Sequence, residues 1–554
     1  MKKITIILCT FLFTMMGVSA QPGTVQKVAK SVFTLTTFKK DGSILASSHG
    51  VFIGNNGDAI STWTPFVGAE SAVVVDASGN KMDVDALEGA NEIYDICKFH
   101  VNRTTSGAVI ASTPSAQGSK VWLVDYSLQK PQMKQLTVSS IEKFMDKYTY
   151  YMYSGEVAEN AYSCPVANQN GQIIGLLQKA KTSTDLYSTD ANFTETFKLN
   201  GLSINEPLYK QTGIRLAMPN SIKDAQLMMI MSQQSGDSIQ HAKYIDDFLR
   251  LFPTAVDGYS AHAQNAIAGN DFATADKDMT TAINKVANKD EAHSEYAKII
   301  YEKEIYKSNV PYTSWTFDKA LDEAKQAYSI KPEPAYKHQQ AQIIYAKGDY
   351  KTAYDMFMDL TKTPIRNGEL FYECAQCKTQ LKAPDTEITA LLDSAVNACP
   401  KPFSPIAAPY FLARGEQYNK LGDYRKAIAD YNKYDTLSVT TPSSAFYYTR
   451  YKAEVAIRQY QPALLDIARA IIITPSEPTY YAEMASLQLR VNQLDNAIKT
   501  ASKCIELAPE YADAYIILGL AQIQKKDKVE GLKQLEKAKE LGDSRAQGLI
   551  DKYK

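Results

Sequence analysis

A repeat of about 34 residues runs from about residue 222 to the C-terminus of this chain. Within each unit, two stretches with helical spacing of apolar residues are separated by a short turn. The clearest unit begins at Pro478, carries small residues at Ala485 and Ala501, and ends at Pro509. Small residues at fixed places let two helices approach closely, and a proline cannot continue the second helix. The repeat therefore predicts a row of stacked helix pairs.

Nine units are predicted, and they share this plan with different degrees of regularity. The unit near 290 has an insertion at about 309–315, and the unit near 369 is the least regular. An irregular helical domain is the alternative, but the shared period argues against it. The units begin near residues 222, 256, 290, 334, 369, 408, 444, 478 and 512.

The repeat half closely resembles tetratricopeptide repeat (TPR) proteins. The resemblance implies an all-α superhelical solenoid with an extended groove that binds a protein or peptide partner, lined by the first helix of each pair. Exposed polar side chains of any solenoid have the same residue types, so position alone selects the candidates. The groove candidates are His338, Gln342, Tyr345, Glu416, Asn419, Lys420, Tyr448, Lys452 and Arg490.

Residues 26 to about 220 have a different pattern, with short apolar runs bounded by Gly, Asn, Asp and Ser. Runs such as Ser31–Phe38, Val121–Val124 and Ile173–Leu177 are typical of strands, and turn clusters such as 55–58 lie between them. Because no helical stretches intervene, this half is predicted to be all-β, as a barrel or a sandwich.

Four segments of this half, in order, resemble the trypsin-like serine proteases of the HtrA type. They are Gly50–Ala69, Asn91–Phe99, Asn160–Gly175 and Ile214–Pro219. They are similar to the family's segments around the catalytic histidine, the catalytic aspartate, the serine loop and the last barrel strand. The resemblance implies a double β-barrel with its site between the barrels.

The family's catalytic residues are not all present at the matching positions. The histidine position is Thr64, the aspartate position is Asp95, and the serine position is Tyr162. Threonine cannot accept a proton near neutral pH, and a phenol without an adjacent base is not an activated nucleophile. The resemblance therefore implies a protease fold that has lost catalysis.

Ser163 and Cys164, next to the serine position, are the fallback nucleophiles if the loop is displaced in register. Either would need a base, and this half contains only His49 and His100. His100 is expected to face away from Asp95, and His49 is expected to lie away from the loop. A Cys164–His49 pair stays an alternative, since nucleophile and base can be distant in sequence.

The first 20 residues have the three parts of a secretory signal peptide: two lysines, a short apolar stretch, and small residues before Gln21. The predicted organisation is thus a signal peptide at 1–20, a degenerate trypsin-like domain at 21–221 and TPR repeats at 222–554. No later segment is long enough to span a membrane. The six remaining cysteines are expected to be packing residues, or to include one disulfide involving Cys399.

Composition disfavours other functions. The formal net charge of −1 and the absence of a basic patch argue against nucleic-acid binding. No cofactor or metal-site motif is evident, because Cys374 and Cys377 lack a second pair. The leading hypothesis is an exported, periplasmic protein-binding scaffold without enzyme activity. Release from the cell is the alternative location. A divergent serine or cysteine peptidase whose repeats select substrates is the alternative function.

Overall fold

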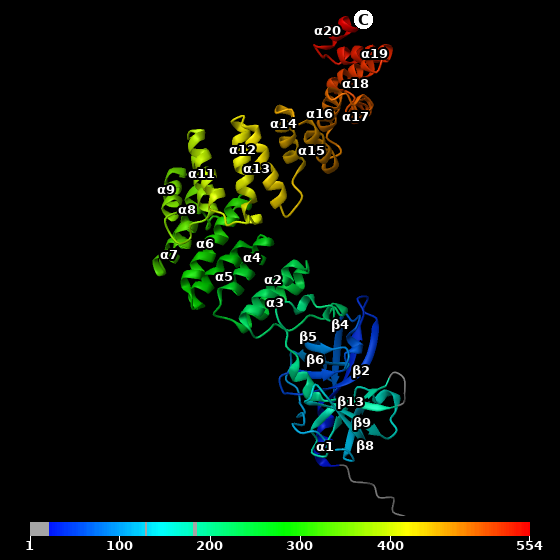
Figure 1. Ribbon diagram of the computed structural model, residues 1–554. Coiled ribbons are helices and arrows are strands. Elements are labelled where there is room, and N and C mark those ends of the chain that lie inside the picture. Colours follow the sequence, from blue (N-terminus) through cyan, green and yellow to red (C-terminus); the bar gives the residue numbers. More distant parts are fainter. Residues whose placement is uncertain (1–21, 128–129, 181–184) are drawn as a thin grey trace, which may run out of the picture. The chain divides into compact units, whose positions relative to one another are not determined.

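The computed structural model describes residues 22–127, 130–180 and 185–554, and the predicted signal peptide at 1–20 lies outside them. Two compact units are present, one that ends at Asn288 and one that spans Lys289–Lys554 (Figure 1). The first unit contains all the strands and four helices of the repeat region. The second contains only helices and the loops that connect them.

The first six strands close into an antiparallel barrel with the order β1-β2-β3-β6-β5-β4. Its core is rich in aromatic residues, and Phe33, Phe52, Phe66 and Phe99 are each at most 1% exposed. The strands are β1 (Val32–Phe38), β2 (Ile44–Phe52), β3 (Asp58–Ser61), β4 (Ser71–Asp76), β5 (Lys81–Asn91) and β6 (Ile96–Val101).

The next seven strands form a second sheet with the order β11-β10-β7-β8-β9-β13-β12. A single antiparallel bridge between Gly175 and Asp190 links the β11 end of this sheet to the segment after β13, so the sheet curls into a second barrel. The strands are β7 (Lys120–Ser127), β8 (Lys130–Phe144), β9 (Tyr148–Ser154), β10 (Pro165–Ala167), β11 (Ile173–Leu176), β12 (Gln178–Lys179) and β13 (Leu186–Thr189). The predicted double-barrel fold is confirmed.

The two barrels share a hydrophobic core. Val51 and Ile60 of the first barrel pack with Val124 and Ile173 of the second, and Val25 of the short helix α1 (Gly23–Val28) joins them. All five side chains are fully buried, so the relative position of the two barrels is fixed by apolar contacts. Polar groups at this boundary are consequently held in one arrangement.

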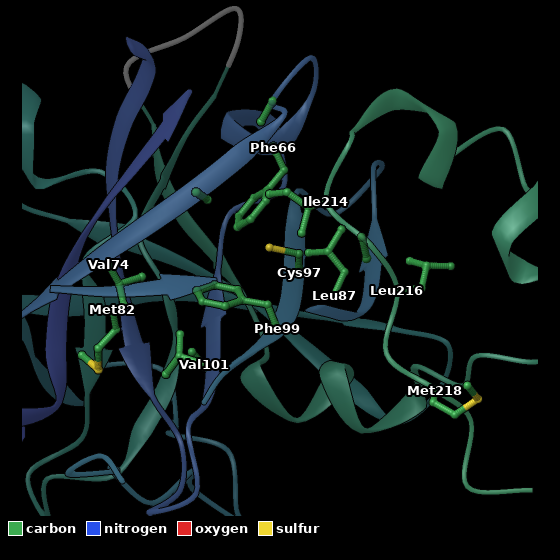
Figure 2. Close-up of a cluster of buried hydrophobic side chains, with 14 of the residues drawn as sticks. Phe66, Val74, Met82, Leu87, Cys97, Phe99, Val101, Ile214, Leu216 and Met218 are labelled. Carbon is green, nitrogen blue, oxygen red and sulfur yellow. The ribbon is translucent and has the colours of Figure 1, made fainter. Parts of the chain in front are cut away.

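The segment Ile214–Pro219 corrects one expectation. It was expected to be the last barrel strand, but it makes only a parallel bridge between Leu216 and Leu87 of β5. Ile214 and Leu216 lie beside Leu87 and Cys97 of the barrel (Figure 2). The apolar side chains of this segment therefore cover the barrel without extending the sheet.

Two helices also contribute to the core of the first barrel. Tyr244, Ile245 and Phe248 of α3 (Ser238–Leu251) are fully buried in it, together with Met228 of α2 (Ile222–Gln234). The helices of the first unit after the strands are α2 (Ile222–Gln234), α3 (Ser238–Leu251), α4 (Val256–Ala268) and α5 (Phe272–Lys285). The first predicted repeat thus shares its core with the barrel.

Helices of the second unit alternate as antiparallel pairs followed by a short terminal helix. The loop between α6 and α7 contains the predicted insertion. The helices are α6 (Lys289–Tyr306), α7 (Phe317–Ile330), α8 (Pro334–Ala346), α9 (Tyr350–Leu360), α10 (Gly368–Gln380), α11 (Asp385–Asn397), α12 (Ala408–Lys420), α13 (Tyr424–Leu437), α14 (Ser444–Ala456), α15 (Tyr460–Ile473), α16 (Pro478–Arg490), α17 (Leu494–Leu507), α18 (Ala512–Gln524), α19 (Lys528–Glu540) and α20 (Ala546–Tyr553). This is the TPR-like array that the repeat predicted.

A recurring aspartate explains why the second helix of several pairs begins where it does. Asp349 and Asp423 each accept a hydrogen bond from the backbone N–H three residues later, which caps α9 and α13. The preceding residues, Gly348 and Gly422, have φ angles of 88° and 77°, a left-handed conformation that glycine adopts without steric cost. The turn between paired helices is therefore encoded locally.

The six cysteines that the structure describes are free thiols, so the alternative of a disulfide involving Cys399 is wrong. Cys399 is partly exposed and the other five are buried. Within the described residues, every helix falls short of the length and apolar character needed to cross a membrane.

Candidate functional site

The positions that match the catalytic histidine and aspartate lie in direct contact. Thr64 begins a short 3₁₀ turn after β3, and its backbone N–H and hydroxyl donate to Asp95 Oδ1 at 2.7 and 2.9 Å. Asp95 precedes β6 and has a φ of 43°, an uncommon conformation for a non-glycine residue. The carboxylate that would orient an imidazole instead holds the turn that carries Thr64.

A structural role for Asp95 makes a measurable prediction. Asp95→Ala leaves the N–H of Thr64 without its acceptor, so we expect a loss of about 1–2 kcal/mol in the free energy of unfolding. Chemical unfolding followed by circular dichroism measures it, with the exposed Glu92→Ala as the control. An Asp95→Ala protein as stable as the wild type would contradict this role.

The serine loop lies across the barrel boundary from this pair. Tyr162, at the serine position, follows a 3₁₀ turn at Glu159–Ala161. The next residue, Ser163, is buried, and its hydroxyl shares a 2.9 Å hydrogen bond with the hydroxyl of Thr62 in the first barrel. Ser163 has a φ of 69°, so the loop keeps a left-handed turn although glycine is absent. The hydroxyl of Ser163 contacts another hydroxyl at this point, which cannot act as a base.

Backbone amides of the loop are also engaged. The N–H of Ser163 donates to Leu177 O at 2.7 Å, and the N–H of Cys164 donates to Ala161 O at 3.3 Å. An oxyanion hole needs N–H groups that point at the substrate. These two backbone N–H groups are therefore occupied by hydrogen bonds within the fold itself.

Cys164 lies in a buried polar cluster with His49 and Asp125. One ligand-type atom from each residue lies within 4.8 Å of the others. The thiol of Cys164 donates to Asp125 Oδ1 at 3.8 Å, and the imidazole of His49 hydrogen-bonds to the backbone carbonyl of Tyr162. His49 was expected to lie away from the loop, and that expectation is wrong. The register of β2 against β3 and the shared barrel core bring it there.

Electrostatics oppose a reactive thiolate in this cluster. Burial raises the pKa of the Cys164 thiol well above its usual range, and the nearby Asp125 carboxylate raises it further. Burial also lowers the pKa of His49, which keeps the imidazole neutral near pH 7. A neutral thiol beside a neutral imidazole is a poor nucleophile.

His100 belongs to a second polar cluster, away from Asp95 as expected. Its Nδ1 lies 3.1 Å from Asp58 Oδ1, and the carboxylate of Glu88 pairs with Lys98 at 2.6 Å. The cluster borders a cavity of about 880 Å³ that also includes Arg215. Glu88 pairs with Lys98, Asp58 with His100, and Arg215 with Asp85 and Asp247. Such pairing is typical of a network of charged side chains at a protein surface.

The His100–Asp58 pair predicts a pH dependence. Its hydrogen bond to Asp58 raises the pKa of His100 above the ordinary value of about 6.5. The resulting stabilisation is present below pH 6.5 and is lost as the pH rises through the higher folded-state pKa. We expect Asp58→Asn to lower the pKa of His100, measured by NMR titration of the imidazole protons. Glu88→Gln should change it less, and an unchanged pKa in Asp58→Asn would contradict the assignment.

The predicted groove residues lie on first helices of the pairs, and several join one repeat to the next. His338 Nε2 and Gln342 Nε2 of α8 contact the carboxylate of Glu373 in α10 at 2.6 and 2.8 Å. The hydroxyl of Tyr448 in α14 donates to Glu483 in α16 at 3.3 Å. These side chains are therefore held in place by the neighbouring repeat.

The other candidates differ in exposure and contacts. Lys452 lies over the ring of Tyr448 at 4.7 Å, and Lys420 donates to Asp385 at 2.7 Å. The ring of Tyr345 packs against Tyr350. Asn419 is half-buried, and the remaining two, Glu416 and Arg490, are exposed. Sequence position identified the helices, but it could not show which side chains bind their neighbours.

Comparisons with known proteins identify proteases and a TPR protein among similar solved structures. No family model matches the chain. The active form of the Rv3671c protease from M. tuberculosis is 13% identical, with 32% of this chain and 82% of that chain covered at a TM-score of 0.28. The serine endoprotease from Yersinia pestis is 14% identical, with coverages of 34% and 65% and a TM-score of 0.28. YrrB, a TPR protein described with an unusual peptide-binding site, is 18% identical, with coverages of 35% and 97% and a TM-score of 0.31. The fold assignment itself stands on the strand and helix pairing described above.

Proposed function

We propose that this chain is an exported, non-catalytic protein-binding scaffold that combines a trypsin-like pseudoprotease domain with a TPR interaction array. One observation carries the proposal: Asp95, the retained acid of the triad, accepts its hydrogen bonds from Thr64 and not from an imidazole. The signal-like pattern at residues 1–20 supports export to the periplasm.

The arrangement of the serine loop agrees with an inert domain. Tyr162 occupies the nucleophile position, and the hydroxyl of Ser163 bonds to Thr62. Replacing a triad member in a protease of this kind removes most of its rate enhancement, and here two members are replaced. A preserved barrel without this chemistry is suited to contact a partner and not to cut it.

The helix pairs would supply the partner site. Hydrogen bonds between successive first helices, such as His338 to Glu373 and Tyr448 to Glu483, hold polar and aromatic side chains in place on this face. Rigid tyrosines lose little conformational entropy when they bind, which suits recognition of a peptide or protein segment. We place the partner-binding surface on the first-helix face that includes Tyr448 and Arg490.

A displayed peptide library selected on the purified chain without residues 1–20 tests this site. Calorimetry then measures the affinity of the selected peptides. We expect Tyr448→Ala with Arg490→Ala to weaken binding at least tenfold, about 1.4 kcal/mol. The control is Lys533→Ala on α19, a second helix, where the side chain is 74% exposed. Equal binding by the double variant and the Lys533→Ala control, when circular dichroism shows that both are folded, would contradict this placement.

The second candidate function is a divergent cysteine peptidase, and the approach of His49 to Cys164 favours it. An activated cysteine would react stoichiometrically with iodoacetamide in the native protein. Because Cys164 is 0% exposed and its thiol pKa is raised, the scaffold proposal predicts that labelling of Cys164 requires unfolding. Rapid native labelling at Cys164 alone would favour the peptidase.

A further inference from the structure

Three residues from separate parts of the sequence converge at the boundary between the barrels. His49 lies on β2, Asp125 lies on β7, and Cys164 precedes β10. The ligand-type atoms of the three lie within 4.8 Å of one another, and Asp125 and Cys164 are 8% and 0% exposed. The non-catalytic scaffold proposed above does not account for this cluster.

One nitrogen of the cluster has no hydrogen-bond partner. His49 Nδ1 is buried without one, and the backbone carbonyl of Tyr162 lies next to the imidazole. A histidine that ligates a metal commonly donates its second N–H to a backbone carbonyl, which fixes the ring and its tautomer. His49 therefore has a buried nitrogen, Nδ1, that is available as a ligand.

The donor set is one thiol, one imidazole and one carboxylate, which is a typical combination for Zn²⁺. Around a tetrahedral Zn²⁺ with ordinary bond lengths, the sulfur and the carboxylate oxygen would lie about 3.5 Å apart. The observed separation of Cys164 Sγ and Asp125 Oδ1 is 3.8 Å. Small side-chain movements would therefore bring the donors to coordination distance.

We propose that His49, Asp125 and Cys164 form a structural binding site for Zn²⁺ that links the two barrels. On binding, the S–H bond of Cys164 breaks, the sulfur coordinates the metal, and the proton passes to solvent. The dication together with one thiolate and one carboxylate is electrically neutral, which suits a buried position.

A structural role fits the surroundings better than a catalytic one. The core shared by the barrels surrounds the site, and the loop amides of Ser163 and Cys164 are already bonded. The more exposed cluster of Asp58, Glu88 and His100 is a weaker candidate, because Lys98 neutralises Glu88 at 2.6 Å. A cation at the buried site would hold β2 against the second sheet.

Cobalt is the probe for this proposal, because Co²⁺ bound to a thiolate gives a charge-transfer band in the near-ultraviolet and visible bands typical of tetrahedral geometry. The full chain without residues 1–20 is refolded from denaturant with one equivalent of Co²⁺, so that the metal can reach the buried site. We expect both bands, their loss on adding excess Zn²⁺, and a melting temperature that Zn²⁺ raises by several degrees.

Variants separate this site from other thiols. Cys164→Ser and His49→Ala should remove the charge-transfer band, and Asp125→Asn should weaken Co²⁺ binding at least tenfold. Cys97→Ser is the matched control, since Cys97 is also 0% exposed but lies on β6 outside the cluster. Refolded wild-type protein with native circular dichroism and no band would overturn the proposal, and so would a band that persists in Cys164→Ser. Peptide binding by the repeats is independent of either outcome.

Discussion

A chain that ends at residue 221 is expected to lose at least about 5 kcal/mol of unfolding free energy relative to a chain that ends at Asn288. The shorter chain lacks α2 and α3, whose Met228, Tyr244, Ile245 and Phe248 are fully buried in the core of the first barrel. Each large apolar side chain contributes about 1.5–3 kcal/mol when it is buried. Without them, the segment Ile214–Met218 and the barrel side chains beneath it are left exposed to water.

Urea unfolding of the two chains, followed by circular dichroism, measures the difference. A single substitution gives an independent test within the full chain. Phe248→Ala should cost about 3–5 kcal/mol, and Phe252→Ala, where the side chain is only partly buried against the same core, should cost less. Equal midpoints for the two truncated chains would show that the first helix pair is a separate body.

The second large effect is expected at Arg450 in the helical array. This residue is 3% exposed, and its guanidinium contacts Asp466 Oδ2 at 2.5 Å, Asp435 Oδ2 at 2.9 Å and Asn432 Oδ1 at 3.1 Å. Asp466 is itself 2% exposed. Arg450→Met keeps the volume but leaves a buried carboxylate without its main cation, so we expect a loss of about 3–5 kcal/mol.

Chemical denaturation of the Arg450→Met protein measures this loss, and two further variants interpret it. Arg469→Met removes a neighbouring cation that is 51% exposed, and it should cost less than about 1 kcal/mol. The double variant Arg450→Met with Asp466→Leu should recover most of the stability, because the unpaired buried charge is gone. A double variant that is less stable than Arg450→Met would contradict the account.

The starts of the repeats could be predicted from sequence because the signals are local. Units expected near 334, 444 and 478 coincide with the first residues of α8, α14 and α16. Within a pair, the start of the second helix is also set locally, by the aspartate caps of α9 and α13 at Asp349 and Asp423. The terminal helix α20 was not expected, because it carries no second copy of the pattern.

The β-rich half was predicted less completely, because its arrangement depends on pairing between distant strands. The long antiparallel pair β8–β9 was not expected, since its apolar and polar residues do not form a short buried run. Segment Ile214–Pro219 looked like a strand from its apolar alternation, yet only one bridge forms. Alternation of apolar and polar residues indicates that one face of a segment is buried. It does not specify that a neighbouring strand forms hydrogen bonds with that segment.

Part of the candidate site followed from sequence and part did not. The segments holding Thr64 and Asp95 resembled neighbouring segments of a known site, and the two residues do lie in contact. The approach of His49 to Cys164 was missed, because it arises from the packing of two barrels against each other. The sequence offered only a histidine beside a predicted strand, and that pattern does not specify which residues the histidine will contact.

Hydrolysis of casein and of a mixed fluorogenic peptide library by the purified chain without residues 1–20 measures whether the protein has peptidase activity. We expect no turnover above buffer for the wild type, and the same baseline for Ser163→Ala and Cys164→Ala. Multiple-turnover cleavage by the wild type that Cys164→Ala or Ser163→Ala abolishes, with both variants folded, would contradict it.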